Sequence, residues 1–587
     1  MNLLPLRYFQ IVMFLLAAVP CGIPFRYQPN PVFPSELAAF VFSALLVLGA
    51  VFLPAPEDKR NRLPGASLPW FVLAGVIALQ CWLVATPYLS ERTVPILYLL
   101  CAGFSVWALA RAKSCFDTSA LMEAFAWGLL AGTLFNSGVA TTQLIDLFQN
   151  GWRLIYGNIG QRNMYGHYLA WGLAATAWLA SERKLPQWLF WPLASWLALS
   201  MAWSSSRSVF IYALTWLPMA GFIAWRGQDS VRRFGLYLGA AAVLIVAMQF
   251  VAPVVNDIIQ SLLKASNAAP TGVDRLASNG SRRLVEWTKA WMTFKDYPWI
   301  GAGWGAYGVH SVILQTLPNF AKVQESVLFT HAHNSLLNLM AETGIFGAGA
   351  VTAGILWVYA GLLRRWKDPV ILAATAMATV SILHSLVEYP LWYYHLFGPF
   401  VLMLVFMRDD GIYLPLCERI QRSGAAICAG SLLAVAAIGA HYYLKIYPIL
   451  EPADNEKTNG ANIRVLETLR HNPLLDFYGD FALSNYIVAS EKDMPWKLAI
   501  LRKLNSLRPY PGQMTDQAVM EALSGNEARA HELMRQAAYA YPESFDYFYE
   551  TLKRFKQPQV GALLQDVEEA RHFFGAKRPD VNDAEKK

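Results

Sequence analysis

The sequence predicts an all-α polytopic membrane protein with about 13 transmembrane helices, one large loop and a helical C-terminal domain. Of its 587 residues, 55% are hydrophobic and only 15% are charged, whereas soluble domains are about one quarter charged. The mean hydropathy is +0.31. The chain also has 21 Trp and 26 Tyr residues, which favour the two membrane interfaces. Apolar stretches of the length that a helix needs to cross a bilayer, roughly 20 residues, recur along the chain.

These stretches define the expected transmembrane helices. They cover residues 7–25, 36–54, 68–86, 94–111, 118–140, 165–181, 186–203, 208–225, 234–254, 335–363, 369–388, 391–407 and 424–446. The first stretch ends in small residues, as a signal peptide does. Because so many apolar stretches follow it, a first transmembrane helix is the favoured interpretation.

Basic residues predict the orientation, because they alternate between the connecting segments. They gather in segments 58–62, 110–113, 182–184, 226–233, 364–367 and 408–422. Lys and Arg mark cytoplasmic loops, so we expect these segments and the N-terminus in the cytoplasm of a bacterial inner-membrane protein. The net charge of +7 by itself decides nothing about partners.

The expected organisation has four parts. Residues 1–254 hold nine transmembrane helices, 255–334 form a large periplasmic loop, 335–446 hold four more helices, and 447–587 form a periplasmic helical domain. In that domain, Ala530, Leu533, Met534, Ala537 and Tyr541 form one apolar stripe that ends at Pro542. This pattern resembles a tetratricopeptide-type helix pair, and a plain helical bundle is equally compatible.

Five polar clusters are expected on the outer face. They are GNIGQRNMYGH from Gly157, SSSRS around Arg207, SRRLVEW from Ser281 with a following GAGWG, HAHNSLLNLMAETGIFG from His331, and LHSLVEYPLWYY from Leu383. Polar residues at the edge of a membrane bundle are costly to desolvate and therefore merit a functional hypothesis.

Arginine and histidine are the residues in these clusters that indicate a chemistry. A guanidinium group stays charged and matches phosphate oxygens with two parallel hydrogen bonds. Histidine, whose ordinary pKa is about 6.5, can take a proton from a hydroxyl group. Together they predict displacement of a polyprenyl diphosphate by an alcohol. No acidic pair lies on the outer membrane surface, so we expect neither a metal nor a cofactor.

The order of these motifs resembles the O-antigen ligase superfamily, and LHSLVEYPLW with the outer C-terminal tail is similar to its PglL-type protein O-oligosaccharyltransferases. The resemblance covers most of the chain from about residue 120. It implies a GT-C-like helix bundle, a glycan donor on undecaprenyl diphosphate and an exported, pilin-like acceptor protein glycosylated on Ser or Thr. No nucleic acid is implied.

Carried over motif by motif, the resemblance implies a set of site residues. His333 would be catalytic, Arg207 and either Arg283 or Arg282 would bind the diphosphate, and Gln161, Asn163, Tyr389 and His331 would contact substrate.

Structural roles compete with these assignments. Gln161 and Asn163 could cap a helix, and the arginines could extend to lipid headgroups. The GAGWG segment predicts a tight turn without a nucleotide role. Glu342 lies deeper along its helix, where a buried partner is the expected contact.

Two other classes of activity are compatible with these residues. An O-antigen ligase or glycan polymerase would use the same donor. A lipid-linked glycan flippase would instead need polar residues on both faces and near the midplane.

Overall fold

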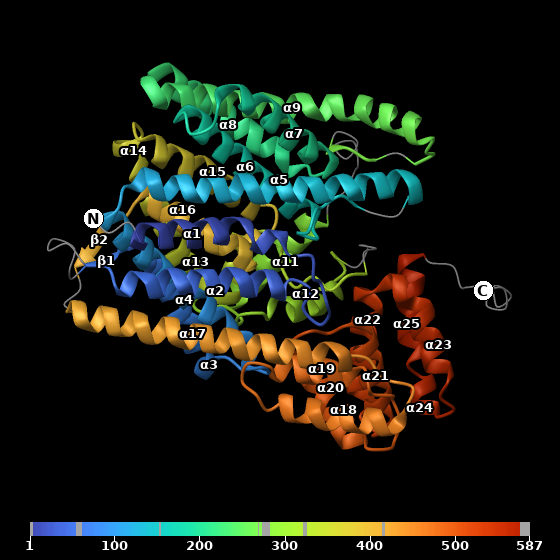
Figure 1. Cartoon of the computed structure of the whole chain (residues 1–587). Helices are drawn as coiled ribbons and strands as arrows, with labels where there is room; N and C mark the ends of the chain where they lie inside the picture. The colour runs from blue at the N-terminus through green and yellow to red at the C-terminus, as the bar shows by residue number, and fades with distance from the viewer. Residues whose placement is uncertain are drawn as a thin grey trace. The chain divides into compact units, whose positions relative to one another are not determined.

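The computed structural model describes residues 4–54, 62–151, 154–267, 269–272, 282–320, 326–413 and 417–575. Within these ranges the regular structure is almost entirely helical (Figure 1). The only strands in the described ranges are β1 (Arg62–Pro64) and β2 (Gly411–Tyr413), which pair antiparallel with Arg62 opposite Tyr413. The expected all-α class is therefore confirmed.

Every predicted transmembrane stretch coincides with a helix. These helices are α1 (Leu4–Ala18), α2 (Phe33–Val51), α3 (Leu68–Leu83), α4 (Ser90–Cys115), α5 (Thr118–Asn150), α6 (Arg162–Ser181), α7 (Gln187–Trp203), α8 (Ser208–Arg226), α9 (Asp229–Leu263), α13 (Ser335–Ala360), α15 (Pro369–Ser385), α16 (Tyr394–Met407) and α17 (Glu418–Ile446). Among the described residues, nine helical segments are long and apolar enough to cross a membrane, and α15 and α16 are shorter apolar helices. The chain is thus a multi-pass membrane protein, while the count of 13 stays a prediction.

Helix α6 is neither one of the nine long apolar segments nor one of the two shorter apolar helices, and its surroundings explain why. From Met164 to Ser181 all of its residues are buried, because α5, α7, α9 and α15 pack around it. A helix enclosed by protein on all sides does not have to face lipid, so it can carry the polar residues that lower its hydropathy.

The chain divides into two compact units, and each unit combines three separate segments of the sequence. Unit 1 comprises Met1–Ala74, Leu97–Gly280 and Gly349–His441, and unit 2 comprises Gly75–Ile96, Ser281–Ala348 and Tyr442–Lys587. In unit 1, α1, α2, α5, α8 and α9 run along one common direction (Figure 1). In unit 2, the expected large loop from Ser281 onward and the C-terminal domain are parts of one compact body, whereas the first residues of that loop, 255–263, continue helix α9 in unit 1.

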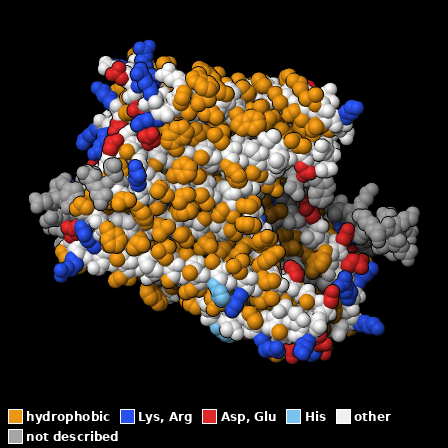
Figure 2. Space-filling view, in the orientation of Figure 1, with side chains coloured by type: hydrophobic (Ala, Val, Ile, Leu, Met, Phe, Trp, Pro, Cys, Tyr) orange, Lys and Arg blue, Asp and Glu red, His pale blue; other side chains and the backbone are white. Residues whose placement is uncertain are grey.

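One end of unit 1 collects several of the basic segments. Arg365 forms an ion pair with Asp410 at 2.7 Å, and Lys113 lies 3.7 Å from Asp409. Lys and Arg side chains gather at the end near the N-terminus, whereas hydrophobic side chains cover the helices beside it (Figure 2). Segments 110–113, 364–367 and 408–422 thus share one end of the unit, as predicted, and the cytoplasmic location of that end stays an expectation.

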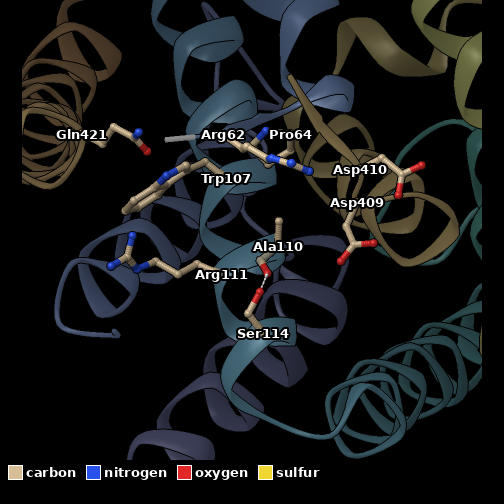
Figure 3. A pocket seen from close by; sticks show the side chains of 10 residues that line it. Arg62, Pro64, Trp107, Ala110, Arg111, Ser114, Asp409, Asp410 and Gln421 are labelled. Atoms are coloured by element: carbon tan, nitrogen blue, oxygen red, sulfur yellow. Dashed lines mark hydrogen bonds between the residues drawn. The ribbon is translucent and has the colours of Figure 1, made fainter. Parts of the chain in front are cut away.

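A cavity of about 200 Å³ opens at the same end. Asp409 and Asp410 face it from one side, while Arg62, Trp107 and Arg111 line it elsewhere (Figure 3). The Arg111 side chain is already paired with Glu418 at 2.7 Å. The predicted site residues do not line this cavity.

Unit 2 contains the remaining helices. They are α11 (Arg283–Asp296), α12 (Tyr307–Gln315), α18 (Glu456–Leu469), α19 (Asp476–Ser484), α20 (Met494–Asn505), α21 (Pro511–Leu523), α22 (Glu527–Ala540), α23 (Phe545–Lys553), α24 (Pro558–Gly561) and α25 (Leu564–Phe574). Short 3-10 turns and the four-residue α14 (Leu362–Arg365) complete the described structure. The predicted stripe on α22 is buried from Ala530 to Tyr541, and the helix ends before Pro542. A tetratricopeptide-type repeat stays a prediction.

Several contacts join the C-terminal helices to other segments of unit 2. The Asp476 carboxylate accepts hydrogen bonds from the backbone N–H groups of Leu89 and Ser90 at 2.7 and 3.0 Å, which caps α4. Arg508 donates to the Gly305 carbonyl at 2.9 Å. Its guanidinium group also pairs with Glu91 at 3.0 Å. The C-terminal helices therefore fix both the start of α4 and the GAGWG turn.

That turn meets a kink in α13. Gly344 has φ 61° and ψ −162° within the helix. The Gly303 N–H donates to the Glu342 carbonyl, and the Ile345 N–H donates to the Pro298 carbonyl. Gly301, Gly303 and Gly305 all have positive φ, so the predicted tight turn is present.

Candidate active site

The GNIGQRN segment forms a turn that leads into α6 of unit 1. The Gln161 side chain accepts a hydrogen bond from the Met164 N–H at 2.6 Å and so caps the helix. Asn136 on α5 accepts from the Asn158 N–H at 2.9 Å, and Gln143 accepts from the Gly157 N–H at 2.9 Å. Gln161 therefore does cap a helix, which was the alternative to a substrate contact. Helix α5 holds the turn in which Gln161 lies.

A hydrogen bond joins the EYPL turn to this segment. The Asn163 amide donates to the Glu388 carboxylate at 2.9 Å, although the two residues are 225 positions apart. Glu388 is 4% exposed. The adjacent Tyr389 ring lies 5.9 Å from the Tyr393 ring, centroid to centroid. Gln161, Asn163 and Tyr389 are thus brought to one end of unit 1.

Arg207 ends the SSSRS turn immediately before α8, which packs on α6. Ser205 has φ +53° and donates a hydrogen bond to the Pro270 carbonyl at 2.8 Å, which shapes this turn. Within the part of unit 1 that the structure describes, neither a hydrogen bond nor an ion pair engages the Arg207 guanidinium group. A half-buried arginine with open N–H groups is suited to bind an anion.

Two buried histidines lie on helices α6 and α15. His167 on α6 hydrogen-bonds Ser381 and His384, both at 3.0 Å. Both imidazoles are 0% exposed. They tie α6 to α15 and thereby support the end of the unit that carries Asn163 and Tyr389.

His333 lies in unit 2, in the turn before α13. Its backbone is left-handed with φ +53°, a conformation that is uncommon for residues other than glycine. Trp287 on α11 donates a hydrogen bond to the His333 carbonyl at 3.3 Å, and the Phe329 ring lies 5.5 Å from the imidazole. The following Asn334 caps α13 by accepting from the Leu337 N–H at 3.0 Å. His333 is therefore held by its backbone and by ring packing.

His331 is two residues earlier and has different partners. Its Nδ1 lies 2.9 Å from the Thr330 hydroxyl oxygen. Burial, reinforced by the charges of Arg508 and His333, lowers the pKa of His331 well below its ordinary value. The imidazole is consequently neutral near pH 7.

Arg282 is part of a buried network in unit 2. It donates to the Glu286 carboxylate at 3.1 Å and to Gln315 at 3.2 Å, and its guanidinium group lies 4.4 Å from the centre of the Phe329 ring. Glu286 also accepts from Lys289 at 3.0 Å and from Tyr307 at 2.7 Å. Although burial opposes ionisation, the charges of Lys289 and Arg282 lower the pKa of Glu286. Burial lowers the pKa of Lys289 to about 8, and the charge of Glu286 opposes that change.

Arg283 occupies a different face of α11. It lies one turn before Trp287, and residues four apart share one helix face. Trp287 is the side chain that contacts the His333 backbone. The structure therefore separates the two neighbouring arginines. Arg282 belongs to the Glu286 network, whereas Arg283 lies on the face of α11 that carries Trp287.

One arginine beside the site was missing from the predicted set. Arg26, in the loop between α1 and α2, donates a hydrogen bond to the Asn158 carbonyl in the GNIGQRN turn. The sequence held a signal for it, because a single basic residue between the first two transmembrane stretches departs from the depletion of Lys and Arg on the outer side. Glu388 was also outside the predicted set, and its contact with Asn163 depends on folding.

The chain resembles three protein families, each over part of its length. Residues 155–180 match a protein glycosylation ligase model, residues 188–352 match an O-antigen ligase model, and residues 372–553 match the C-terminal model of a virulence factor membrane-bound polymerase. The predicted site residues all fall in these matched regions.

Two relatives from Acinetobacter baylyi share longer stretches. A general O-oligosaccharyltransferase is 26% identical over 404 residues, which is 66% of this chain and 68% of the relative. A ComP-specific O-oligosaccharyltransferase is 22% identical over 375 residues, which is 62% of this chain and 66% of the relative.

The fold and the matches together define a multi-pass membrane protein that is similar to O-antigen ligases and O-oligosaccharyltransferases, and these similarities support a glycosyltransferase activity. Within that class, the chain is similar to the PglL-type O-oligosaccharyltransferases, as the order of its motifs indicated.

Proposed function

We propose that this protein transfers a complete glycan from undecaprenyl diphosphate to a Ser or Thr hydroxyl of an exported, pilin-like protein, at the periplasmic face of the inner membrane. The observation that carries this proposal is the similarity to a general O-oligosaccharyltransferase over 404 residues. It is supported by the Arg207 guanidinium group, whose N–H groups form no hydrogen bond or ion pair with the described residues of unit 1.

The proposed reaction exchanges one bond for another. The acceptor hydroxyl oxygen attacks the first carbon of the glycan, the bond from that carbon to the diphosphate oxygen breaks, and the lipid diphosphate leaves with the electron pair. His333 accepts the hydroxyl proton. Arg207 and Arg283 stabilise the charge that develops on the leaving diphosphate, which is usually the largest electrostatic contribution to such a reaction.

The other predicted residues have supporting roles in this proposal. Gln161, Asn163 and Tyr389 contact the substrate, and His331, which is neutral near pH 7, can exchange hydrogen bonds with it. Arg282 keeps α11 in place through Glu286. Arginine and histidine side chains supply both functions that the transfer needs, so we propose that it requires no metal.

Transfer in a reconstituted system tests this proposal. The protein would be co-expressed with a lipid-linked glycan pathway and a candidate pilin, and intact-mass analysis would measure glycan on exported proteins. His333→Ala and Arg207→Ala should each abolish transfer while the protein stays inserted and abundant. Lys295→Ala, which removes an exposed charge from α11, should leave transfer unchanged.

Other outcomes would assign another activity. The polymerase match over residues 372–553 favours glycan polymerisation as the second candidate. Longer glycan chains on the lipid, or glycan on lipopolysaccharide, with none on exported proteins would support a polymerase or an O-antigen ligase. Movement of the lipid-linked glycan between leaflets of a liposome without any transfer would support a flippase.

A chelator addresses the metal separately. Addition of EDTA to the purified protein should leave the transfer rate unchanged, with a metal-dependent glycosyltransferase as the positive control. A loss of transfer that Mg²⁺ or Mn²⁺ restores would contradict metal-independent chemistry.

A further inference from the structure

Arg26 is a half-buried cation fixed against the GNIGQRN turn. Its guanidinium group donates to the Asn158 carbonyl. Gly160, with φ +80°, lies directly against it, since a Cβ atom at that position would be 2.6 Å from the Arg26 guanidinium carbon. Gln161, which begins the cap of α6, is the next residue. The chain therefore uses a glycine where this arginine approaches the backbone.

The charge of Arg26 has no acidic partner among the described residues of unit 1. Burial lowers the pKa of Arg26, and the ionisable groups whose charge it feels are Cys21, Tyr156 and Tyr393. These thiol and phenol groups are ordinarily neutral near pH 7. An unpaired cation that is partly removed from water is unfavourable unless an anion compensates it.

Three other partly buried arginines of this protein are compensated by carboxylates. Arg111 pairs with Glu418 at 2.7 Å, and Arg282 pairs with Glu286 at 3.1 Å. Arg508 pairs with Glu91 at 3.0 Å. Arg26 and Arg207 differ from these three, and both lie in turns that adjoin the start of α6.

We propose that Arg26 binds the diphosphate of the lipid-linked donor, as a substrate-contacting residue in addition to Arg207. This inference rests on the proposed function. A guanidinium group has five N–H donors, and the Asn158 carbonyl accepts one of its hydrogen bonds. The remaining donors can form charge-assisted hydrogen bonds to diphosphate oxygens. The contact with Asn158 and Gly160 orients the group before the donor arrives.

The competing explanation is that Arg26 only fastens the turn. Two substitutions distinguish the explanations. Arg26→Lys keeps the positive charge, and Arg26→Gln keeps an N–H donor for the Asn158 carbonyl but removes the charge. Lys295→Gln is the matched control, because it removes one positive charge from an exposed position of α11.

Binding of undecaprenyl diphosphate to the purified full-length protein is the measurement. This probe carries the proposed anion and would be the released product. Arg26→Gln should weaken its binding about tenfold or more, the effect expected for losing a charge-assisted hydrogen bond. Arg26→Lys should bind more tightly than Arg26→Gln, and Lys295→Gln should match the unmodified protein. All variants should keep the melting temperature of the unmodified protein.

The results separate this inference from the proposed function. If Arg207→Gln weakens binding while Arg26→Gln does not, the role of Arg26 is overturned and the proposed function stands. Equal weakening by Arg26→Lys and Arg26→Gln, accompanied by a lower melting temperature, would also overturn it in favour of a structural role. If the unmodified protein binds no undecaprenyl diphosphate, the donor in the proposed function is wrong as well.

Discussion

At the scale of single residues, membership of the buried Glu286 network distinguishes arginines that the sequence presents as equivalent. Arg282 and Arg283 are adjacent, yet Arg282 is paired with Glu286 in a network that contains Lys289. The side chains of Glu286 and Lys289 are 0% exposed. Breaking such a network leaves a buried charge uncompensated, whereas removal of Arg283 leaves this ion pair intact.

The two substitutions should therefore have different effects. Arg283→Ala should reduce glycan transfer at least about tenfold with little change in the melting temperature, because a lost charge-assisted hydrogen bond is worth about 1.5 to 3 kcal/mol. Arg282→Ala should lower the free energy of unfolding by about 3 kcal/mol, the low end for a broken buried pair, because Lys289 still compensates Glu286. Transfer assays and thermal unfolding in detergent measure both. Lost transfer with unchanged stability in Arg282→Ala would reverse the assignment.

His331 predicts a pH dependence of stability. Because its pKa is lowered in the folded protein, the unfolded chain takes up a proton as the pH falls below about 6.5, while the folded chain does not. The unfolded state then binds more protons, so His331 contributes stability that is present above pH 6.5 and is lost below it.

Removal of the His331 imidazole should make the stability of the protein depend less steeply on pH below about pH 6.5. Between pH 6.5 and pH 5, His331→Gln should lose less stability than the unmodified protein, by at most about 1.4 kcal/mol per pH unit. Thermal unfolding at several pH values measures the difference. His471→Gln, at an exposed position, should follow the unmodified protein, and parallel profiles for all three would contradict the prediction.

At the scale of elements, the kink in α13 links the membrane helix to the GAGWG turn. The φ and ψ of Gly344 fall in a region that is essentially restricted to glycine. A Cβ atom there would lie 2.3 Å from the Trp299 carbonyl carbon. The turn and the helix therefore require each other, since their backbones exchange hydrogen bonds at Gly303 and Ile345.

A pair of glycine substitutions in α13 tests this coupling. Gly344→Ala should lower the free energy of unfolding by about 2 kcal/mol or more, through backbone strain and the clash with Trp299. Gly349→Ala should leave stability unchanged or raise it by less than about 1 kcal/mol, because a Cβ atom there meets nothing within 4 Å. Melting temperatures in detergent provide the comparison. Equal effects of the two variants would show that the kink is dispensable.

At the scale of the whole molecule, the compact bodies do not follow the order of the chain. The segment 75–96, the loop that contains His331 and His333, and the C-terminal helices form unit 2. Asp476 and Arg508 make the joining contacts at α4 and at Gly305. The C-terminal helices are thus coupled to the segments that carry half of the candidate site residues.

Removal of the Asp476 carboxylate should loosen this coupling. Asp476→Ala deprives the Leu89 and Ser90 N–H groups of their acceptor and should cost about 1 to 2 kcal/mol, as for other helix caps. Limited proteolysis should then cut the C-terminal helices faster, and the melting temperature should fall. Asp454→Ala, at an exposed position before α18, serves as the control. Identical proteolysis of both variants would argue against a joining role.

The helices could be predicted from the sequence because hydrophobicity is a local property. An apolar stretch long enough to cross a bilayer becomes a helix whatever its neighbours are, since every backbone polar group must be satisfied within the stretch. The stripe from Ala530 to Tyr541 was recognisable for a related reason, namely its helical period. The order of the motifs, which is also a property of the chain alone, indicated the family.

Tertiary structure decided what depends on distant partners. The hydrogen bond from Asn163 to Glu388, the contact of Arg26 with Asn158 and the pairing of Arg282 within its network join residues whose neighbourhood depends on packing. The sequence by itself determined a multi-pass helical membrane protein with arginine and histidine motifs in the order of a known family. Only the folded chain decided which arginines are neutralised internally, because that depends on the carboxylates that packing brings within reach.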